Sequence, residues 1–343
     1  MCRIIAVGLL SIGFSLVFTG CEDRESNPVS IDPASPSAES VRHSLEAAEA
    51  YLASGDIDRA RSILARLLER ASDDPRPMEL MARLELTGGL DLRKQGLSDA
   101  ARRQFAVAHD WYEQALELDQ DSGGLHQSAG EVAQLAGRLD LARERYRQAS
   151  KLLPDNPKPK LCIAQLILEE NPAEAEIFLR ESLQIEPDEP HALASLALAR
   201  QRQGAGEEAS TLASKALVHA GSSAAVRIAV ARVHRIAGRP RESLELLLAL
   251  PDQVRVGESA TEEISRSWDA IGRPLNAGQA WAACFKANAF RTDAWRLALL
   301  AAEAMGRADQ DIEAASWIEQ AIMLDAPESE VEASRSRIAG ASQ

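Results

Sequence analysis

Small apolar residues recur along this chain in register with one another, at a spacing far longer than the period of a single helix or strand. The steps from Gly204 to Gly238 and from Gly238 to Gly272 are both 34 residues, and a fixed period of that size is typical of repeat proteins. Alanine and proline fall in the same register, which makes a chance match hard to obtain. The three columns consist of Gly204, Gly238, Gly272 and Gly306, of Ala142, Ala175, Ala209 and Ala277, and of Pro154 and Pro187.

The first half of the chain keeps this pattern with a longer period. Gly55, Gly96 and Gly137 are 41 residues apart, and the seven additional residues amount to two helical turns, so a lengthened helix keeps the same face inward. Alanine, leucine, glutamate and arginine dominate the composition, aromatic residues make up 4%, and no convincing strand run is present. The pattern predicts an all-α chain built from helical repeats.

The segment from Gly123 to Pro154 indicates what each column does. Gly130 and Ala142 are expected where two helix backbones approach closely, because a larger side chain would overpack the contact. Gly137 lies between the helices, where a residue that is free to adopt a positive φ ends the first helix, and Pro154 ends the second because it lacks an amide donor. The pattern in this segment also includes Ala129, Ala133, Tyr146 and Ala149.

With these residues the chain resembles the tetratricopeptide repeat (TPR) family. The resemblance implies an all-α, TPR-type α-solenoid, a right-handed superhelix of about eight helix-turn-helix repeats covering residues 41–327. A polar helix and tail, 328–343, would cap the last apolar face. The expected repeats begin near Val41, Pro77, Gly123, Asn156, Pro190, Ala224, Glu258 and Thr292.

The N-terminus predicts export and a lipid anchor. Residues 1–20 combine a short positive region with an apolar stretch, Ile4 to Phe18, that is short for a membrane span and typical of a secretory signal. Thr19, Gly20 and Cys21 resemble the lipobox of bacterial lipoproteins, which implies that Cys21 carries the lipid and becomes the new N-terminus. The alternatives are an ordinary cleaved signal peptide and an uncleaved anchor. Residues 21–40, rich in Ser, Pro, Asp and Glu, are predicted to form a disordered tether.

The overall charge argues against nucleic acid as a partner. The chain has 38 Lys and Arg residues against 52 Asp and Glu residues, a formal net charge of −14. A general nucleic-acid-binding protein is expected to be basic over at least one face, and this chain as a whole is acidic.

A basic stripe is nevertheless predicted on the first helices of the repeats. In the TPR family the first helix of each repeat lines the concave groove, and its groove positions in this chain are basic in the fourth to eighth repeats. Such a stripe could bind an acidic peptide or an anionic glycan through charge-assisted hydrogen bonds. Alternatively it is solvated surface, neutralised by Glu262, Asp269, Asp293 and Glu303. The predicted ligand-binding residues are Lys160, Arg202, Arg232, Arg235, Arg266 and Arg296.

Catalytic and metal-binding motifs are not found. The six histidines are scattered without metal-ligand spacing, and the sequence contains no nucleophile elbow, phosphate-binding glycine loop or H-E-x-x-H motif. Carboxylate pairs such as Glu169 with Glu170, or Glu262 with Glu263, are expected on solvated helix surfaces. We therefore expect no enzymatic activity, no metal and no cofactor.

Together these features predict a non-catalytic scaffold or adaptor that binds protein or peptide partners, with acidic ones as candidates, in a bacterial cell envelope. The lipid would hold it on the inner or outer membrane, facing the periplasm or the exterior. The alternative function is a glycan- or polyanion-binding accessory subunit of an export or cell-wall complex.

Overall fold

The computed structural model describes residues 38–70 and 73–341, which belong to one compact unit, Pro36–Gln343. The predicted signal peptide (1–20), the lipidated Cys21 and most of the predicted tether (21–40) lie outside the described residues. The first helix begins at Ala38, so the last three positions assigned to the tether are helical.

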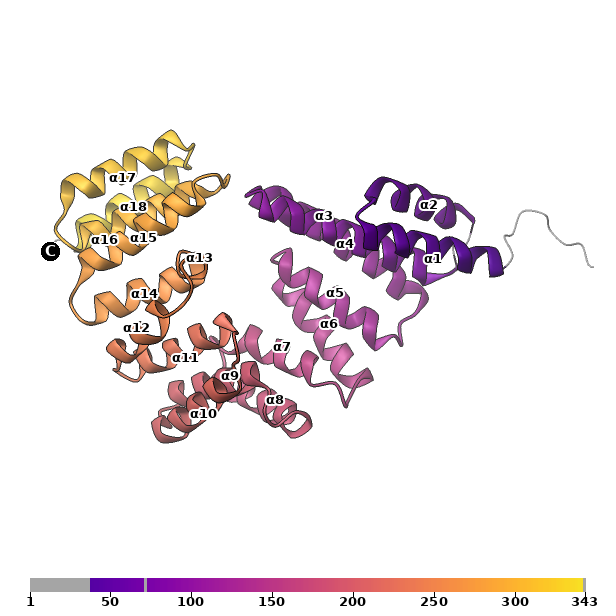
Figure 1. Ribbon diagram of the computed structural model, residues 1–343, viewed down its shortest axis with the longest axis horizontal. Helices are drawn as coiled ribbons and strands as arrows, with labels where there is room; N and C mark the ends of the chain where they lie inside the picture. The colour runs from indigo at the N-terminus through magenta and orange to yellow at the C-terminus, as the bar shows by residue number, and fades with distance from the viewer. Residues whose placement is uncertain (1–37, 71–72, 342–343) are drawn as a thin grey trace, which may run out of the picture. The chain divides into compact units, whose positions relative to one another are not determined.

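The described residues form eight antiparallel helix pairs, in which each pair packs against the next (Figure 1). The first helices of the pairs are α1 (Ala38–Ser54), α3 (Pro75–Lys94), α5 (Gly123–Leu135), α7 (Pro157–Ile167), α9 (Pro190–Arg202), α11 (Ala224–Ile236), α14 (Glu258–Ala270) and α16 (Ala294–Gly306). The second helices are α2 (Ile57–Arg70), α4 (Ser98–Leu118), α6 (Leu139–Leu152), α8 (Pro172–Ile185), α10 (Gly206–His219), α12 (Pro240–Leu248), α15 (Pro274–Asn288) and α17 (Asp311–Met323).

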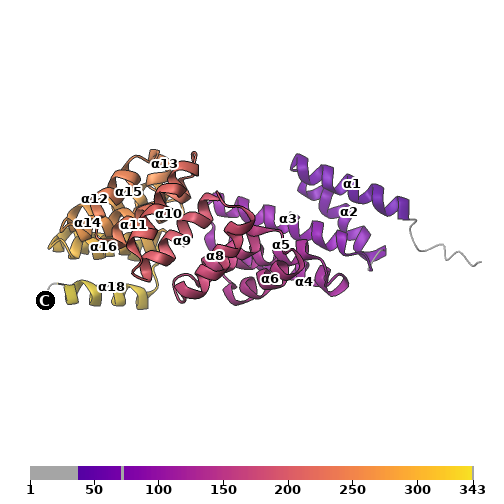
Figure 2. The ribbon, with the colours of Figure 1, turned by 90° about the horizontal axis from the view of Figure 1, so that it is seen from below.

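Two further helices lie outside this pairing. A single turn, α13 (Asp252–Arg255), separates the sixth and seventh pairs, and α18 (Glu328–Ala341) follows the eighth. Figure 2 shows α18 alongside α16, with which it makes most of its contacts. The buried Val331 of α18 joins the same apolar cluster as the core of the eighth pair, so α18 covers the face that no further repeat covers.

Local sequence signals explain where the first helices begin. The side chains of Asp74, Ser122, Asn156, Glu189 and Ser223 precede α3, α5, α7, α9 and α11, and each accepts a hydrogen bond from a backbone amide of the first turn. Proline follows three of these caps, at a position where its missing amide costs no helical hydrogen bond. Among the described residues, five of the eight first helices are therefore capped by side chains, whereas α14 and α16 begin without a side-chain cap.

Most second helices are entered through a left-handed glycine. Gly137 has a φ of +78°, as the sequence predicted, and nothing lies within 4 Å of the position that a Cβ would take. The fourth pair lacks this glycine, and there the side chain of Asn171 caps α8 instead. At Gly137 the turn therefore needs glycine because of the backbone conformation alone.

The assignment of Gly306 to this column is wrong. Gly306 is the last residue of α16, and the left-handed residue of the eighth turn is Asp309, with a φ of +55°. A Cβ on Gly306 would lie 2.7 Å from Ile338 of α18. Asp309 lies 37 residues after Gly272, three more than the 34-residue period, so the chain reverses beyond Gly306. Gly306 is needed instead for the close packing of α18.

The core runs from pair to pair along the chain. Successive buried clusters extend from Val41 to Leu84, from Ala82 to Val132 and from Ala133 to Val233, with two more toward the C-terminus. A Cβ on Gly130 would lie 2.8 Å from the ring of Tyr146, which shows how closely paired helices approach. Within the described residues there is no strand, and the secondary structure is all α, as predicted.

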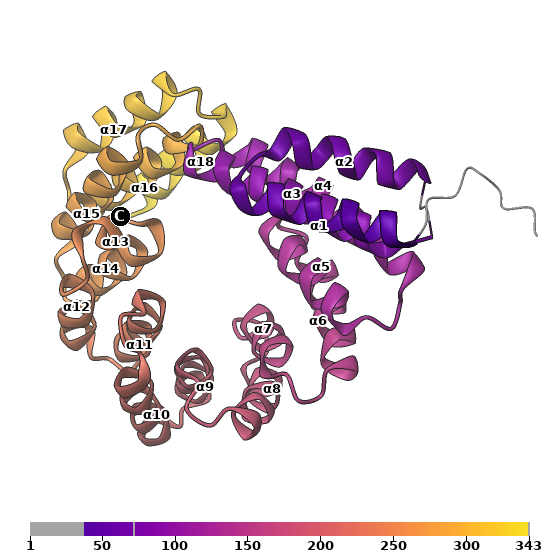
Figure 3. The same ribbon diagram turned by 45° about the vertical axis from the view of Figure 1, so that its right-hand side comes forward.

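One contact joins repeats that are far apart in the sequence. The backbone amide of Thr292, between α15 and α16, donates to the carbonyl of Gly96, in the α3–α4 turn, at 2.9 Å (Figures 1 and 3). The Thr292 hydroxyl donates to the same oxygen at 3.2 Å. Among the described residues, no helix combines the length and the apolar character needed to cross a membrane.

Candidate protein-interaction surfaces

The predicted basic stripe is organised around a buried acid. The side chain of Glu263, on α14, is completely buried, and its two carboxylate oxygens accept from Arg232 Nε at 2.6 Å and from Arg235 Nε at 2.9 Å. Arg266 adds an ion pair to Glu263 at 3.7 Å. We call these four residues the Glu263 cluster. Since a buried carboxylate is stable only when charges and hydrogen bonds compensate it, these arginines support the packing of α11 against α14.

The expectation that Glu263 lies on a solvated surface is therefore wrong. Its neighbour Glu262 is partly exposed and pairs with Arg266 at 2.6 Å, so only one member of the carboxylate pair is buried. The arginines that cover Glu263 come from the preceding repeat, 31 and 28 residues earlier. A search for opposite charges one repeat apart could have found this cluster.

A second acid extends the network toward the N-terminus. Glu169, in the turn after α7, forms ion pairs with Arg202 of α9 and, at 3.5 Å, with Arg232 of α11. The predicted arginines thus connect the fourth to seventh repeats through acids. A ligand carboxylate that approached Arg202 or Arg232 would compete with groups already in place.

The remaining two predicted residues differ from each other. Lys160 is buried, and its ammonium group donates to the carbonyl of Pro154 at 2.7 Å, so it closes the turn before α7. Arg296 of α16 is exposed and forms no ion pair with any described residue. Of the six predicted residues, Arg296 alone has a guanidinium or ammonium group without a partner in the part of the chain that the structure describes.

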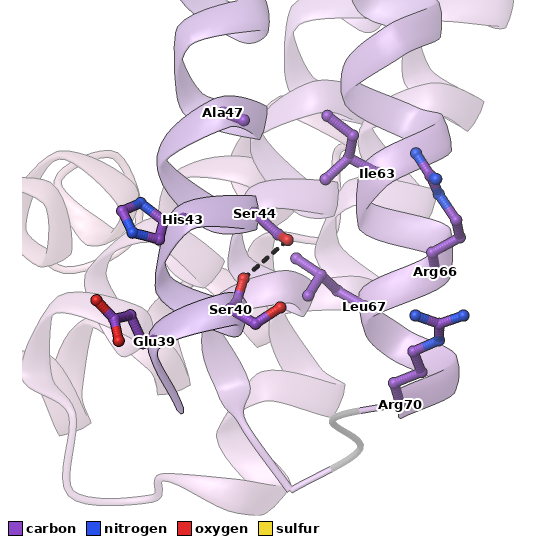
Figure 4. A pocket seen from close by; sticks show the side chains of 9 residues that line it. All are labelled: Glu39, Ser40, His43, Ser44, Ala47, Ile63, Arg66, Leu67 and Arg70. Atoms are coloured by element: carbon purple, nitrogen blue, oxygen red, sulfur yellow. Dashed lines mark hydrogen bonds between the residues drawn. The ribbon is translucent and has the colours of Figure 1, made fainter. Parts of the chain in front are cut away.

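The first repeat contains a hollow (Figure 4). We call it the first-repeat hollow; it has a volume of about 590 Å³ and lies between α1 and α2. Ile63 and Leu67 point into the space between the two helices, while Arg66 and Arg70 lie on the α2 side (Figure 4). Neither arginine forms an ion pair with a described residue. The lining residues are Glu39, Ser40, His43, Ser44, Ala47, Ile63, Arg66, Leu67 and Arg70.

This hollow combines an apolar floor with basic groups at its edge. It lies on the repeat that directly follows the predicted tether, and sequence reasoning did not identify it. The signal was weak, because Arg66 and Arg70 fall on a second helix, whereas the predicted groove uses first helices. Nowhere in residues 38–70 and 73–341 do three or more His, Cys, Asp or Glu side chains come together in a way that could hold a metal ion.

Known proteins share this architecture. Residues 36–84 match the tetratricopeptide repeat family model. Solved structures with a similar fold include a tetratricopeptide repeat protein from Parabacteroides merdae, with a TM-score of 0.59, 15% identity, and coverage of 77% of this chain and 99% of that one. The human IFIT1 dimer with m7Gppp-AAAA gives a TM-score of 0.56 at 16% identity, covering 84% of this chain and 69% of the other.

A curated relative matches part of the chain. The cellulose synthase operon protein C of Xanthomonas axonopodis pv. citri is 30% identical over 166 residues, which is 47% of this chain. The match spans only 10% of the length of that relative.

The helix pairs, the family match and the structural neighbours define a TPR-type α-solenoid. Residues 36–84 match the tetratricopeptide repeat family itself, and the other helix pairs share the fold of that family. Arrays of this kind present extended surfaces that repeat proteins use for binding.

Proposed function

We propose that the protein is a membrane-anchored TPR scaffold that binds protein partners in a bacterial cell envelope and does not catalyse a reaction. The observation that carries the binding role is the stack of eight TPR helix pairs, which presents long helical surfaces. The anchoring role is supported by the sequence Thr19-Gly20-Cys21 after an apolar segment. Lipidation of Cys21 would provide several acyl chains, which together bind a membrane stably.

The first-repeat hollow is our proposed contact for a partner near the membrane. Ile63 and Ala47 offer partly exposed apolar surface, and Arg66 and Arg70 offer guanidinium groups that no described carboxylate occupies. Among the described residues, Arg66 keeps only a hydrogen bond from its Nε to the carbonyl of Ser62, at 3.2 Å. An acidic and partly apolar segment of another protein fits this chemistry.

The predicted groove arginines are a weaker contact in this proposal. Four of them already pair with Glu169, Glu262 or Glu263, namely Arg202, Arg232, Arg235 and Arg266. An acidic ligand would therefore gain little electrostatic attraction there. Because the chain carries a net charge of −14, we propose proteins and not nucleic acids as its partners.

The alternative function is binding of a glycan or another polyanion within an export or cell-wall complex. It is favoured by the partial similarity to a cellulose synthase operon protein. The two functions differ in their ligand, and binding of soluble cellulose oligosaccharides by the purified protein, measured by calorimetry, would support the alternative.

Anchoring is tested by labelling bacterial cells with an alkyne fatty acid and comparing the wild type with Cys21→Ala. We expect the label and the membrane-bound fraction to be lost together in the variant. Unchanged membrane association without label would mean an uncleaved anchor, and release of both proteins in soluble form would mean an ordinary signal peptide.

Partner binding is tested by capture after crosslinking, followed by mass spectrometry. The variant carries Arg66→Glu and Arg70→Glu. The matched control carries Arg103→Glu and Arg241→Glu, two exposed arginines that form no ion pair with a described residue. We expect a protein recovered with the wild type and the control to be lost with the variant. Equal recovery by all three proteins would exclude the first-repeat hollow as the contact.

A further inference from the structure

A second cavity lies where the second repeat meets the segment between α15 and α16. Its volume is about 320 Å³, and its walls come from α3, α4, the end of α5, α15 and the start of α16. We call it the junction pocket. It is lined by Arg93, Ser98, Ala101, Arg102, Phe105, Leu135, Asn288, Phe290, Arg291, Asp293 and Arg296.

A backbone contact holds the two walls of the junction pocket together. Thr292 donates both its amide and its hydroxyl to the carbonyl of Gly96. Gly96 has a φ of +80°, and a Cβ there would lie 2.8 Å from the Cα of Arg291 and 2.8 Å from the ring of Phe290. Only glycine allows both this backbone conformation and this approach.

The lining of the junction pocket is basic although the chain is acidic. Four arginines and a single carboxylate, that of Asp293, lie among the lining residues. Arg102 pairs with Asp99, and Arg291 binds both oxygens of Asp293 at 2.8 and 2.9 Å. Arg93 and Arg296 are exposed and form no ion pair with any residue that the structure describes.

The one carboxylate in the lining is already occupied. Burial disfavours the charged form of Asp293, but the hydrogen bonds and charge of Arg291, with a hydrogen bond from Ser98, outweigh burial and hold the pKa of Asp293 below its usual value. Asp293 therefore neutralises Arg291 and leaves the charges of Arg93 and Arg296 available to a ligand.

Apolar surface lies beside these two guanidinium groups. The guanidinium carbon of Arg93 lies 5.7 Å from the centre of the buried Phe105 ring, a distance that allows a cation–π interaction. Phe290, in the segment between α15 and α16, is 63% exposed, although large apolar side chains are usually covered. The junction pocket thus offers two unpaired positive charges next to aromatic and aliphatic surface.

We propose that the junction pocket binds an acidic segment of a partner protein, in which one or two carboxylates lie next to an apolar side chain. The carboxylates would bind Arg93 and Arg296, and the apolar side chain would contact Phe290 and the partly exposed Leu135. This inference rests on the proposed scaffold function and adds to it a second contact and the chemistry of its ligand.

Charge favours a protein segment over a nucleic acid. A polyanion carries many phosphates and is repelled by a chain with a net charge of −14. A short segment with one or two carboxylates needs only the local surplus of positive charge at Arg93 and Arg296. Guanidinium and carboxylate groups also match in geometry, because two parallel hydrogen bonds can form between them.

The test is selection of a phage-displayed random peptide library on the full-length protein in detergent. We expect enrichment of sequences that combine Asp or Glu with Phe or Leu. Selected peptides, synthesised with a fluorescent label, should bind a variant with Arg93→Glu and Arg296→Glu at least about tenfold more weakly than the wild type, which corresponds to about 1.4 kcal/mol. The control with Arg103→Glu and Arg241→Glu undergoes the same change in net charge and should bind nearly as the wild type does.

Three results would overturn the proposal: selection of no acidic sequence, equal peptide binding by both double variants, or displacement of the peptides by a single-stranded oligonucleotide that binds more tightly. Circular dichroism and thermal unfolding check that the variants are folded, which is expected because both arginines are exposed and unpaired. The two proposals can fail separately. If the peptide test fails but a partner is captured through Arg66 and Arg70, the scaffold function is supported and the junction pocket is not its binding site.

Discussion

Two arginine-rich regions of this protein have opposite properties. In the Glu263 cluster, Arg232 and Arg235 donate to one fully buried carboxylate, and Glu169 extends the network. In the junction pocket, Arg93 and Arg296 are exposed and have no described acid as a partner. The comparison teaches that the number of arginines on a surface does not indicate a binding site. What matters is whether the chain itself supplies the opposite charge.

Removing the charge of the buried Glu263 should have the largest effect on the stability of the protein. Glu263→Gln keeps the shape of the side chain and removes its charge, which leaves Arg232 and Arg235 uncompensated. We expect a loss of about 3 kcal/mol in the free energy of unfolding, measured by urea denaturation. Glu262→Gln is the control, since its carboxylate is partly exposed, and a loss within about 0.5 kcal/mol is expected. Similar losses for both variants would mean that burial of Glu263 is not what stabilises the array.

Substitution of Gly96, the glycine at the junction, should have the second-largest effect on stability. Gly96→Ala combines an unfavourable positive φ with overpacking against Arg291, and we expect a loss of about 2 kcal/mol. Gly137→Ala is the matched variant, because its φ is similar, +78° against +80°, with no atom within 4 Å. It should lose only about 1 kcal/mol. If the two variants unfold at the same urea concentration, the contact between Gly96 and Thr292 contributes nothing to stability.

Replacing one arginine in each region should show a smaller difference in stability between the Glu263 cluster and the junction pocket. Arg235→Ala removes a hydrogen bond to a buried charged group and should cost about 1.5 kcal/mol. Arg296→Ala removes an exposed, unpaired side chain and should change the stability by about 0.5 kcal/mol or less. Thermal unfolding of the two variants side by side measures the difference. A large loss in Arg296→Ala would show that Arg296 has a structural partner.

The pH dependence of the junction should be the smallest effect. Burial raises the pKa of Asp293, but Arg291 more than offsets burial, so the folded pKa lies below the usual value of 3.8. A depressed pKa contributes stability above the unfolded pKa, and that stability is lost as the pH falls through the folded pKa. Wild-type stability should therefore fall more steeply than that of Asp293→Asn below about pH 4. Parallel profiles for the two proteins would contradict this assignment.

The structure also changes which variants are informative about binding. Substituting Arg232, Arg235 and Arg266 together would remove every arginine around Glu263 and would test folding more than ligand recognition. Arg66 with Arg70, and Arg93 with Arg296, are better choices, because no described carboxylate pairs with any of them.

Much of the fold could be predicted from the sequence because its signals are local. The turn at Gly137 and the close approach at Gly130 each depend on one residue type at one position, and a repeat displays them several times. The prediction failed at Gly306, where three additional residues moved the turn to Asp309. Spacing alone could not distinguish a glycine needed for a left-handed turn from one needed for the packing of α18.

Less of the candidate site could be predicted. The sequence identified Arg296 but not Arg93, Arg102 and Arg291, because the last three lie outside the groove positions of the first helices. It also placed Glu263 in solvent, since a carboxylate on an amphipathic helix usually faces water. In both cases the decisive neighbours belong to another repeat.

By itself, then, the sequence determined the helical repeat, the length of its period and the residues at its turns, because each of these depends on backbone conformation and on contacts within a helix pair. Only the tertiary structure decided which charges are compensated. Burial and pairing depend on the distance between side chains from different repeats, as between Arg232 and Glu263 or across the junction at Gly96 and Thr292. Those distances are set by the way the pairs stack, which no single repeat specifies.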